Sequence, residues 1–273
     1  MSSCGITNLG TCLVEGLFNF IVYILNLPVK PLLAMINNLM IELVNIQIFA
    51  NTWSIIIYML SLFYGILLLI VGFRFMLSGS SPEQREKAKM SLMNILLMMV
   101  LVQTSFFLYE LILQVVASMT AVVYEMIPNS FFLVTSEGFA NIGLELVLII
   151  PYIITLVVTV IFLALRYICV GMGVIFFAIG IFMYFIEPLQ DYGKLIINYL
   201  GVLISLPFIY AIILLASSKF LETDTFSSMK IIVMIGGFSL VNLLTIFLVI
   251  FVIFKAANSR PVKQITTVVQ AVA

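Results

Sequence analysis

The chain has 273 residues, of which 64% are hydrophobic and only 9% are charged, and its 12 basic and 12 acidic side chains balance. A balanced charge argues against a general nucleic-acid surface, because affinity for phosphates comes from clustered lysine and arginine. The sequence contains no histidine and only three cysteines, so it lacks the commonest metal ligand and the commonest general base near neutral pH. We therefore expect no metal site and no cofactor.

Long apolar runs dominate the sequence, and charged residues gather in the gaps between them. About 20 apolar residues cross the roughly 30 Å of hydrocarbon in a bilayer, and a spanning segment must pair every backbone amide, so these runs predict helices. We predict an all-α polytopic transmembrane protein with about five spans. The runs cover residues 53–73, 92–116, 144–186, 195–218 and 231–254.

Three regions follow from this pattern. Residues 1–50 form an external amphipathic region, 51–255 the transmembrane helical domain, and 256–273 a cytoplasmic tail. One membrane domain fills nearly the whole length and leaves no room for a soluble catalytic domain. We find no pairing of a nucleophile with a base in the spans and no phosphate-binding glycine loop, so we do not expect an intramembrane protease, and any ATPase would be a partner protein.

Two short polar-striped segments precede the first span, at residues 11–27 and 31–49. Polar side chains recur in them at helical spacing, which predicts two amphipathic helices lying in the membrane interface. Pro28 and Pro31 separate them, because proline cannot continue a helix interior. A short first span over residues 13–27 is the alternative. Cys4 and Cys12 lie in this external region, where a disulfide closing a short loop is plausible.

The gap after the first span has the clearest local signals. That span runs from Trp53 to about residue 77. Ser81 suits a helix N-cap and Pro82 the first helical position, so a new helix should start here and continue into the second span. The densest basic cluster of the chain flanks this loop, which places the loop in the cytoplasm. The cluster comprises Arg74, Arg85, Lys87 and Lys89.

The remaining loops set the predicted topology. The connection 117–143 contains no lysine or arginine and should face outward. Residues 144–186 would form about 64 Å of helix, either as two spans that meet near Arg166 or as one long tilted helix that is broken near Gly171 and Gly173. The distribution of basic residues favours one crossing. The N-terminus is then outside and the C-terminus in the cytoplasm, with 187–194 as a cytoplasmic loop and 219–230 as an external one.

Few polar residues fall within the apolar runs. Arg166 is the only strong charge deep in a run, and such a charge is by default a functional candidate; the alternative is an arginine that snorkels to the interface near a helix break. Glu110 and Glu145 lie near the outer ends of their spans, and each would pair with Arg166 only if the long helix packs deeply. Gly171 and Gly173 favour close helix packing, and a hinge is the alternative.

These features together resemble one family. The two segments before the first span, the five-span outline, the loop from Gly72 to Lys89 and the block from Leu165 to Pro207 are similar to the polytopic inner-membrane channel subunit of type IV secretion and conjugation systems, the TrbL type. The related archaeal DNA-exchange (Ced) membrane protein shares this pattern. The chain departs from the family at Gly171 and Gly173, where a proline is common, and its only tryptophan is Trp53.

The resemblance implies a non-enzymatic subunit that forms a homo-oligomeric ring in the cytoplasmic membrane. Its implied partners are pilin-like subunits, a membrane-associated ATPase and DNA as the transported substrate, with the basic loop meeting the ATPase or anionic lipid. Two alternatives stay open. One is a small-solute secondary transporter, although the sequence shows no inverted repeat. The other is a non-conducting membrane assembly protein.

Overall fold

The computed structural model describes residues 9–77, 82–133, 142–223, 226 and 229–257. Helices make up nearly all of these residues, and no strand occurs among them, which confirms the prediction of an all-α polytopic protein. Within this part of the chain, six helical segments are long and apolar enough to cross a membrane, against about five expected. They are Asn19–Ile41, Ile46–Leu77, Ser105–Glu125, Val147–Tyr184, Glu187–Phe220 and Lys230–Val252.

The additional candidate span lies in α1 (Leu9–Ile41), which replaces the two predicted interfacial helices. Pro28 and Pro31 both lie inside this helix, so the prediction that they end it was wrong. Each proline removes one backbone hydrogen bond, and the bonds on either side maintain the helix, as is common in membrane helices. The chain breaks instead after α1, where the Asn45 side chain accepts from the Gln47 amide at 3.2 Å and caps η2 (Ile46–Phe49).

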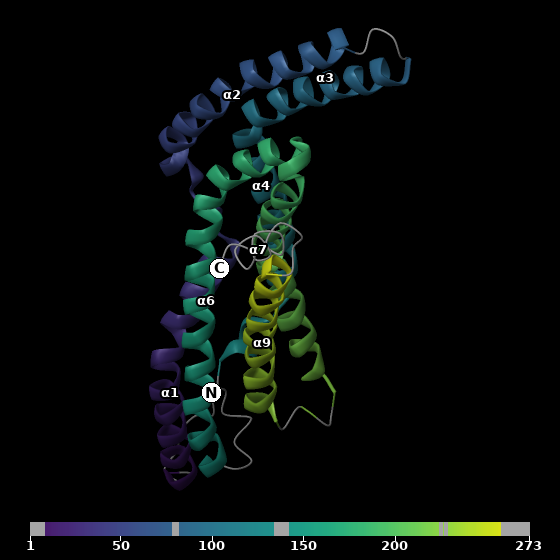
Figure 1. Ribbon diagram of the computed structural model, residues 1–273. Helices are drawn as coiled ribbons and strands as arrows, with labels where there is room; N and C mark the ends of the chain where they lie inside the picture. The colour runs from purple at the N-terminus through teal and green to yellow at the C-terminus, as the bar shows by residue number, and fades with distance from the viewer. Residues whose placement is uncertain (1–8, 78–81, 134–141, 224–225, 227–228, 258–273) are drawn as a thin grey trace, which may run out of the picture. The chain divides into compact units, whose positions relative to one another are not determined.

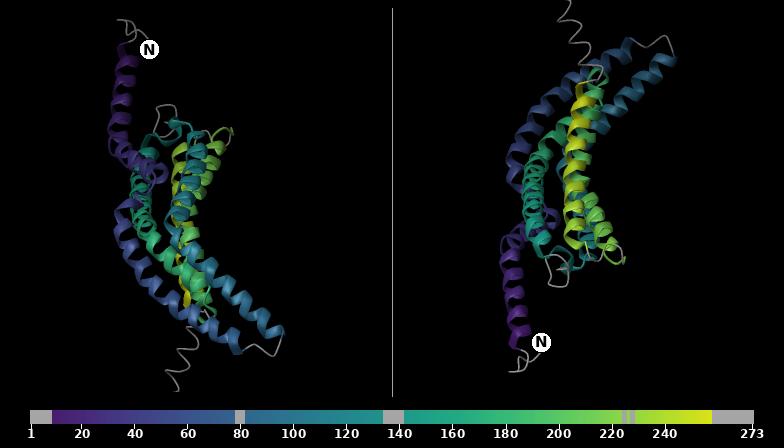
Figure 2. Two further views of the ribbon diagram at one scale, coloured as in Figure 1. Left: turned by 90° about the horizontal axis from the view of Figure 1, so that it is seen from above. Right: turned by 90° about the horizontal axis from the view of Figure 1, so that it is seen from below.

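Two long helices, α2 (Ala50–Leu77) and α3 (Pro82–Gln103), lie side by side as an antiparallel hairpin (Figures 1 and 2). As predicted, α3 begins at Pro82. The hairpin packs on the second half of α6 (Ile142–Tyr184) through an apolar core. This core comprises Ile57, Leu60, Val71, Ile95, Met98, Val102, Ala178, Ile181 and Phe182.

The second span does not lie where the sequence placed it. We expected one uninterrupted helix through residues 92–116, whereas α3 ends at Gln103 and α4 covers Ser105–Glu125. Thr104 separates them, and its hydroxyl donates to the Val100 carbonyl at 2.9 Å. Such back-bonding by threonine bends helices. The bend separates the charged first half of the segment from the apolar α4.

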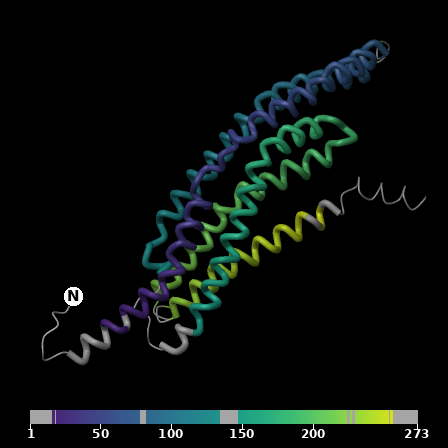
Figure 3. Tube along the Cα trace, turned by 90° about the vertical axis from the view of Figure 1, so that its left-hand side faces the viewer, coloured from purple at the N-terminus to yellow at the C-terminus, as the bar shows by residue number. Residues whose placement is uncertain are grey.

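The apolar run 144–186 does not contain the break that was expected near Gly171 and Gly173. Its residues 144–184 lie in one unbroken helix, α6. It is followed by η4 (Glu187–Leu189) and α7 (Gln190–Phe220), and Figure 3 shows the chain turning back at this point. After α7 the chain continues to α9 (Lys230–Ala257). Among the residues described between α4 and α6, Asn129–Phe132 form the four-residue helix α5.

The chain divides into two compact units, and four of the long helices pass from one unit to the other. The first unit contains residues 1–42, 117–165 and 206–247. The second contains residues 43–116, 166–205 and 248–273. Each unit has its own interhelical hydrogen bonds.

Candidate functional site

Arg166 lies in the second unit, in the middle of α6, and only 8% of its surface is exposed. Its Nε donates to the Leu203 carbonyl at 3.0 Å, and its Nη2 donates to the Ile204 carbonyl at 3.3 Å. Both acceptors belong to α7. The arginine is therefore bonded to the backbone of a neighbouring helix and does not snorkel to an interface.

One of these carbonyls, that of Leu203, needs an outside donor because of Pro207, which lies inside α7. In a regular helix the Leu203 carbonyl would accept from the amide of residue 207, but proline has no amide hydrogen. A carbonyl left unpaired in an apolar environment costs about 1–3 kcal/mol. Arg166 supplies the missing donor and so compensates for the proline in α7.

Two acidic residues, Glu110 and Glu145, were considered as partners of Arg166, and only the side chain of Glu110 is described. Glu110 is half-buried on α4, and the described ion pairs do not include it. Glu145 lies in α6, but its side chain is outside the described residues, as is that of Cys12 in α1. Cys4 also lies outside them. The Cys4–Cys12 disulfide stays a prediction.

Gly173 allows two helices to pack closely beside the arginine. Buried Tyr109 on α4 donates from its hydroxyl to the Val170 carbonyl of α6 at 2.7 Å. A Cβ at Gly173 would collide with the Tyr109 hydroxyl and would lie 2.7 Å from Leu200. Gly171 is less constrained, since its nearest neighbour would be the Phe49 ring at 3.2 Å. Both glycines lie inside the unbroken helix α6, and a hinge at them stays a prediction.

The first unit contains a polar cluster that the sequence reasoning missed. Thr159 of α6 donates from its hydroxyl to Asn242 Oδ1 of α9 at 3.0 Å, and Asn242 Nδ2 donates to the Thr155 carbonyl at 3.1 Å. A third interhelical bond joins the hydroxyls of Tyr210 and Thr245. Asn242 within an apolar run was the available signal, because polar residues inside spans are costly unless they are paired.

Replacing Asn242 with leucine should destabilise the protein by about 1 kcal/mol, because both of its bonds between α6 and α9 are lost. The two side chains are similar in size, so little cavity forms. Thermal unfolding in detergent measures the effect. Asn198→Leu is the control, since Asn198 is exposed on α7. A melting temperature that falls equally in the two variants would contradict the assignment.

The four predicted basic residues lie at the tip of the α2–α3 hairpin in the second unit. Arg74 is in the last turn of α2, the other three are in the first turns of α3, and all four are exposed. Lys87 pairs with Glu83 at 2.8 Å. Two cavities adjoin Arg74, of about 250 Å³ and about 260 Å³, and both are lined by Arg74 and Ser91.

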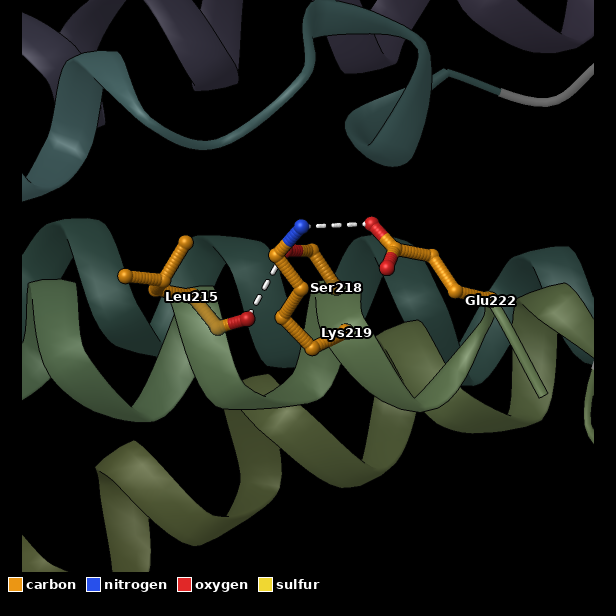
Figure 4. A network of polar contacts seen from close by, with 4 residues as sticks. All are labelled: Leu215, Ser218, Lys219 and Glu222. Carbon is orange, nitrogen blue, oxygen red and sulfur yellow. Dashed lines mark hydrogen bonds and ion pairs between the residues drawn. The ribbon is translucent and has the colours of Figure 1, made fainter.

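Charges also mark the far end of α7, in the first unit (Figure 4). Lys219 pairs with Glu222 at 2.6 Å, and Ser218 donates from its hydroxyl to the Leu215 carbonyl at 2.8 Å. The ion pair is exposed, as is usual where a membrane helix reaches the headgroups. The pair lies at the C-terminal end of the candidate span Glu187–Phe220.

Comparison with known proteins finds no match: no protein-family model, no curated protein and no solved structure is similar to this chain. The geometry and the sequence are therefore the basis for assigning a function.

Proposed function

We propose that this protein is a self-associating, membrane-embedded subunit of a secretion-type conduit for DNA, of the kind that the TrbL-type resemblance implies. It would form a homo-oligomeric ring in the cytoplasmic membrane, with pilin-like subunits and a membrane-associated ATPase as partners. The basic loop at the α2–α3 tip would face the cytoplasm. If α1 crosses the membrane, an even number of spans brings both termini to the cytoplasmic side.

The observation that carries the proposal is the low burial of the long apolar helices. Only 17% of an 18-residue apolar stretch in the candidate span Asn19–Ile41 is buried. The buried share is 22% in Ile46–Leu77 and in Ser105–Glu125, and it is 44% in Glu187–Phe220. In a membrane protein, the exposed apolar faces of helices are covered by lipid or by other subunits. Helices with so few neighbours in their own chain are suited to packing between copies.

The environment of Arg166 favours this function over small-solute transport. A secondary transporter binds its substrate near the bilayer midplane, where unwound helices offer polar groups. Arg166, the charged residue that is buried in the described part of this chain, donates to carbonyls of α7. The helix that carries it, α6, is not unwound at this position. A non-conducting assembly protein would have the same helices, and it is distinguished from a conduit by the shape of the assembly.

Native mass spectrometry and electron microscopy of the purified protein test the proposal. We expect a closed ring of several copies with a central opening. Lysine cross-linking in the native membrane, before extraction, controls for dissociation by detergent. A protein that stays monomeric in both experiments would contradict the ring, and a closed assembly without an opening would favour the non-conducting alternative.

A further inference from the structure

The two cavities at the tip of the α2–α3 hairpin share two lining residues, Arg74 and Ser91, and together they are called the recess here. The first is lined by apolar side chains of α2, α3 and residues 185–188, together with Ser91 and Asn94. The second is also mostly apolar in its lining, with Leu77 and Ala88 beside Gln84 and Lys87. Arg74 and Ser91 border both cavities, so a guanidinium group lies next to apolar surface in each of them.

The charges around the recess favour an anion. Arg74 takes part in neither ion pair found among the described residues, and Lys87 and the first turn of α3 add positive potential. Two carboxylates oppose this: Glu83 pairs with Lys87, and Glu187 borders the apolar cavity. Arg74 is thus the cation available to a ligand, and a guanidinium binds phosphate oxygens through paired hydrogen bonds.

The surroundings favour a lipid over a soluble anion. Met76 and Leu77, two and three residues after Arg74, are 77% and 80% exposed, which suits a segment immersed at the membrane surface. The apolar cavity of about 250 Å³ is smaller than the roughly 300–1,000 Å³ of sites that enclose a whole small ligand. It would hold the first part of one acyl chain while the rest of the lipid stays in the bilayer.

We propose that this recess is a specific site for an anionic phospholipid, with the phosphate bound by Arg74 and one acyl chain in the cavity bordered by α2, α3 and residues 185–188. Ser91 and Asn94 would donate to the phosphate or to the glycerol ester oxygens. The site does not depend on the secretion role proposed above. Arg85, the other arginine of the basic cluster, does not line the recess. The phospholipid would therefore be a ligand of Arg74 in particular.

Lipid binding to the delipidated full-length protein tests this proposal, with native mass spectrometry as the readout. Phosphatidylglycerol and phosphatidylcholine with identical acyl chains are titrated separately. We expect phosphatidylglycerol to bind at least tenfold more tightly, and Arg74→Gln to remove that preference. Arg85→Gln removes the same charge from the same cluster outside the recess, and it should change the affinity less than twofold.

Two further experiments are needed. One distinguishes binding in the recess from binding to a charged surface, and the other distinguishes binding of a lipid from binding of a free anion. Ser91→Phe keeps every charge but fills the space that the two cavities share, so it should also weaken phosphatidylglycerol binding about tenfold. Inorganic phosphate at millimolar concentration should not displace the lipid. Equal losses in Arg74→Gln and Arg85→Gln, unchanged binding in Ser91→Phe, or displacement by phosphate would each overturn the proposal. Circular dichroism of each variant shows that a loss is not due to unfolding.

Discussion

Replacing Arg166 with methionine should destabilise the protein by about 3 kcal/mol, because a buried carbonyl loses its charged donor. Nε and Nη2 of Arg166 donate to the Leu203 and Ile204 carbonyls, and methionine fills a similar volume without a donor. Thermal or denaturant unfolding in detergent measures the change. Arg85→Met is the control, since Arg85 is exposed on α3. This substitution should lower the free energy of unfolding by no more than about 0.5 kcal/mol.

A double-mutant cycle with Pro207→Ala tests the reason for this effect. Alanine at position 207 restores the amide that the Leu203 carbonyl lacks, so Arg166→Met should cost about 1–2 kcal/mol less in that background. Additive effects of the two substitutions would show that Arg166 does not compensate for Pro207. Arg166→Lys keeps the charge with a single donor group, and its stability should lie between those of the wild type and Arg166→Met.

Replacing Gly193 with alanine should be the most damaging single-methyl change in the second unit. A Cβ at Gly193 would lie 2.7 Å from the Gly180 carbonyl oxygen and would collide with the backbone of Tyr184. No side-chain rotation relieves a clash with backbone, so α6 and α7 would have to separate. We expect a loss of about 3 kcal/mol or more, seen as a lower melting temperature and less monodisperse protein in gel filtration.

Gly201 provides a matched control in the same helix. A Cβ at Gly201 would meet nothing within 4 Å, so Gly201→Ala should stabilise α7 by about 0.5–1 kcal/mol through helix propensity alone. Opposite signs for the two variants would confirm that close contact between α6 and α7 decides the outcome. Equal effects would mean that the contact at Gly193 is unimportant for stability.

The sequence predicted the helices well, because apolar runs of membrane width specify helices regardless of tertiary contacts. It correctly predicted that α3 starts at Pro82, but the break that it predicted near Gly171 and Gly173 is absent from α6. It failed at Pro28 and Pro31, where the end of a helix was inferred from a local rule that membrane helices often override. The bend at Thr104 was also missed, since one threonine in an apolar run has no distinctive pattern.

The partners of the polar residues could not be predicted from the sequence. Arg166 stood out as a buried charge, and acidic side chains were the natural candidates for its partner. Its acceptors are backbone carbonyls of α7, which carry no side-chain signal. Pro207 was the one available clue, because an interior proline predicts an unpaired carbonyl four residues earlier. Which helix would supply the donor depends on three-dimensional packing.

The two bonds of Arg166 to α7 bear on how a conduit built from this chain would respond to membrane voltage. Moving one elementary charge through a potential of 100 mV releases about 2.3 kcal/mol. Each hydrogen bond to a charged group contributes about 1.5–3 kcal/mol, and Arg166 would have to break two of them. In such a conduit, a resting potential of this size would not supply the free energy needed to displace this arginine.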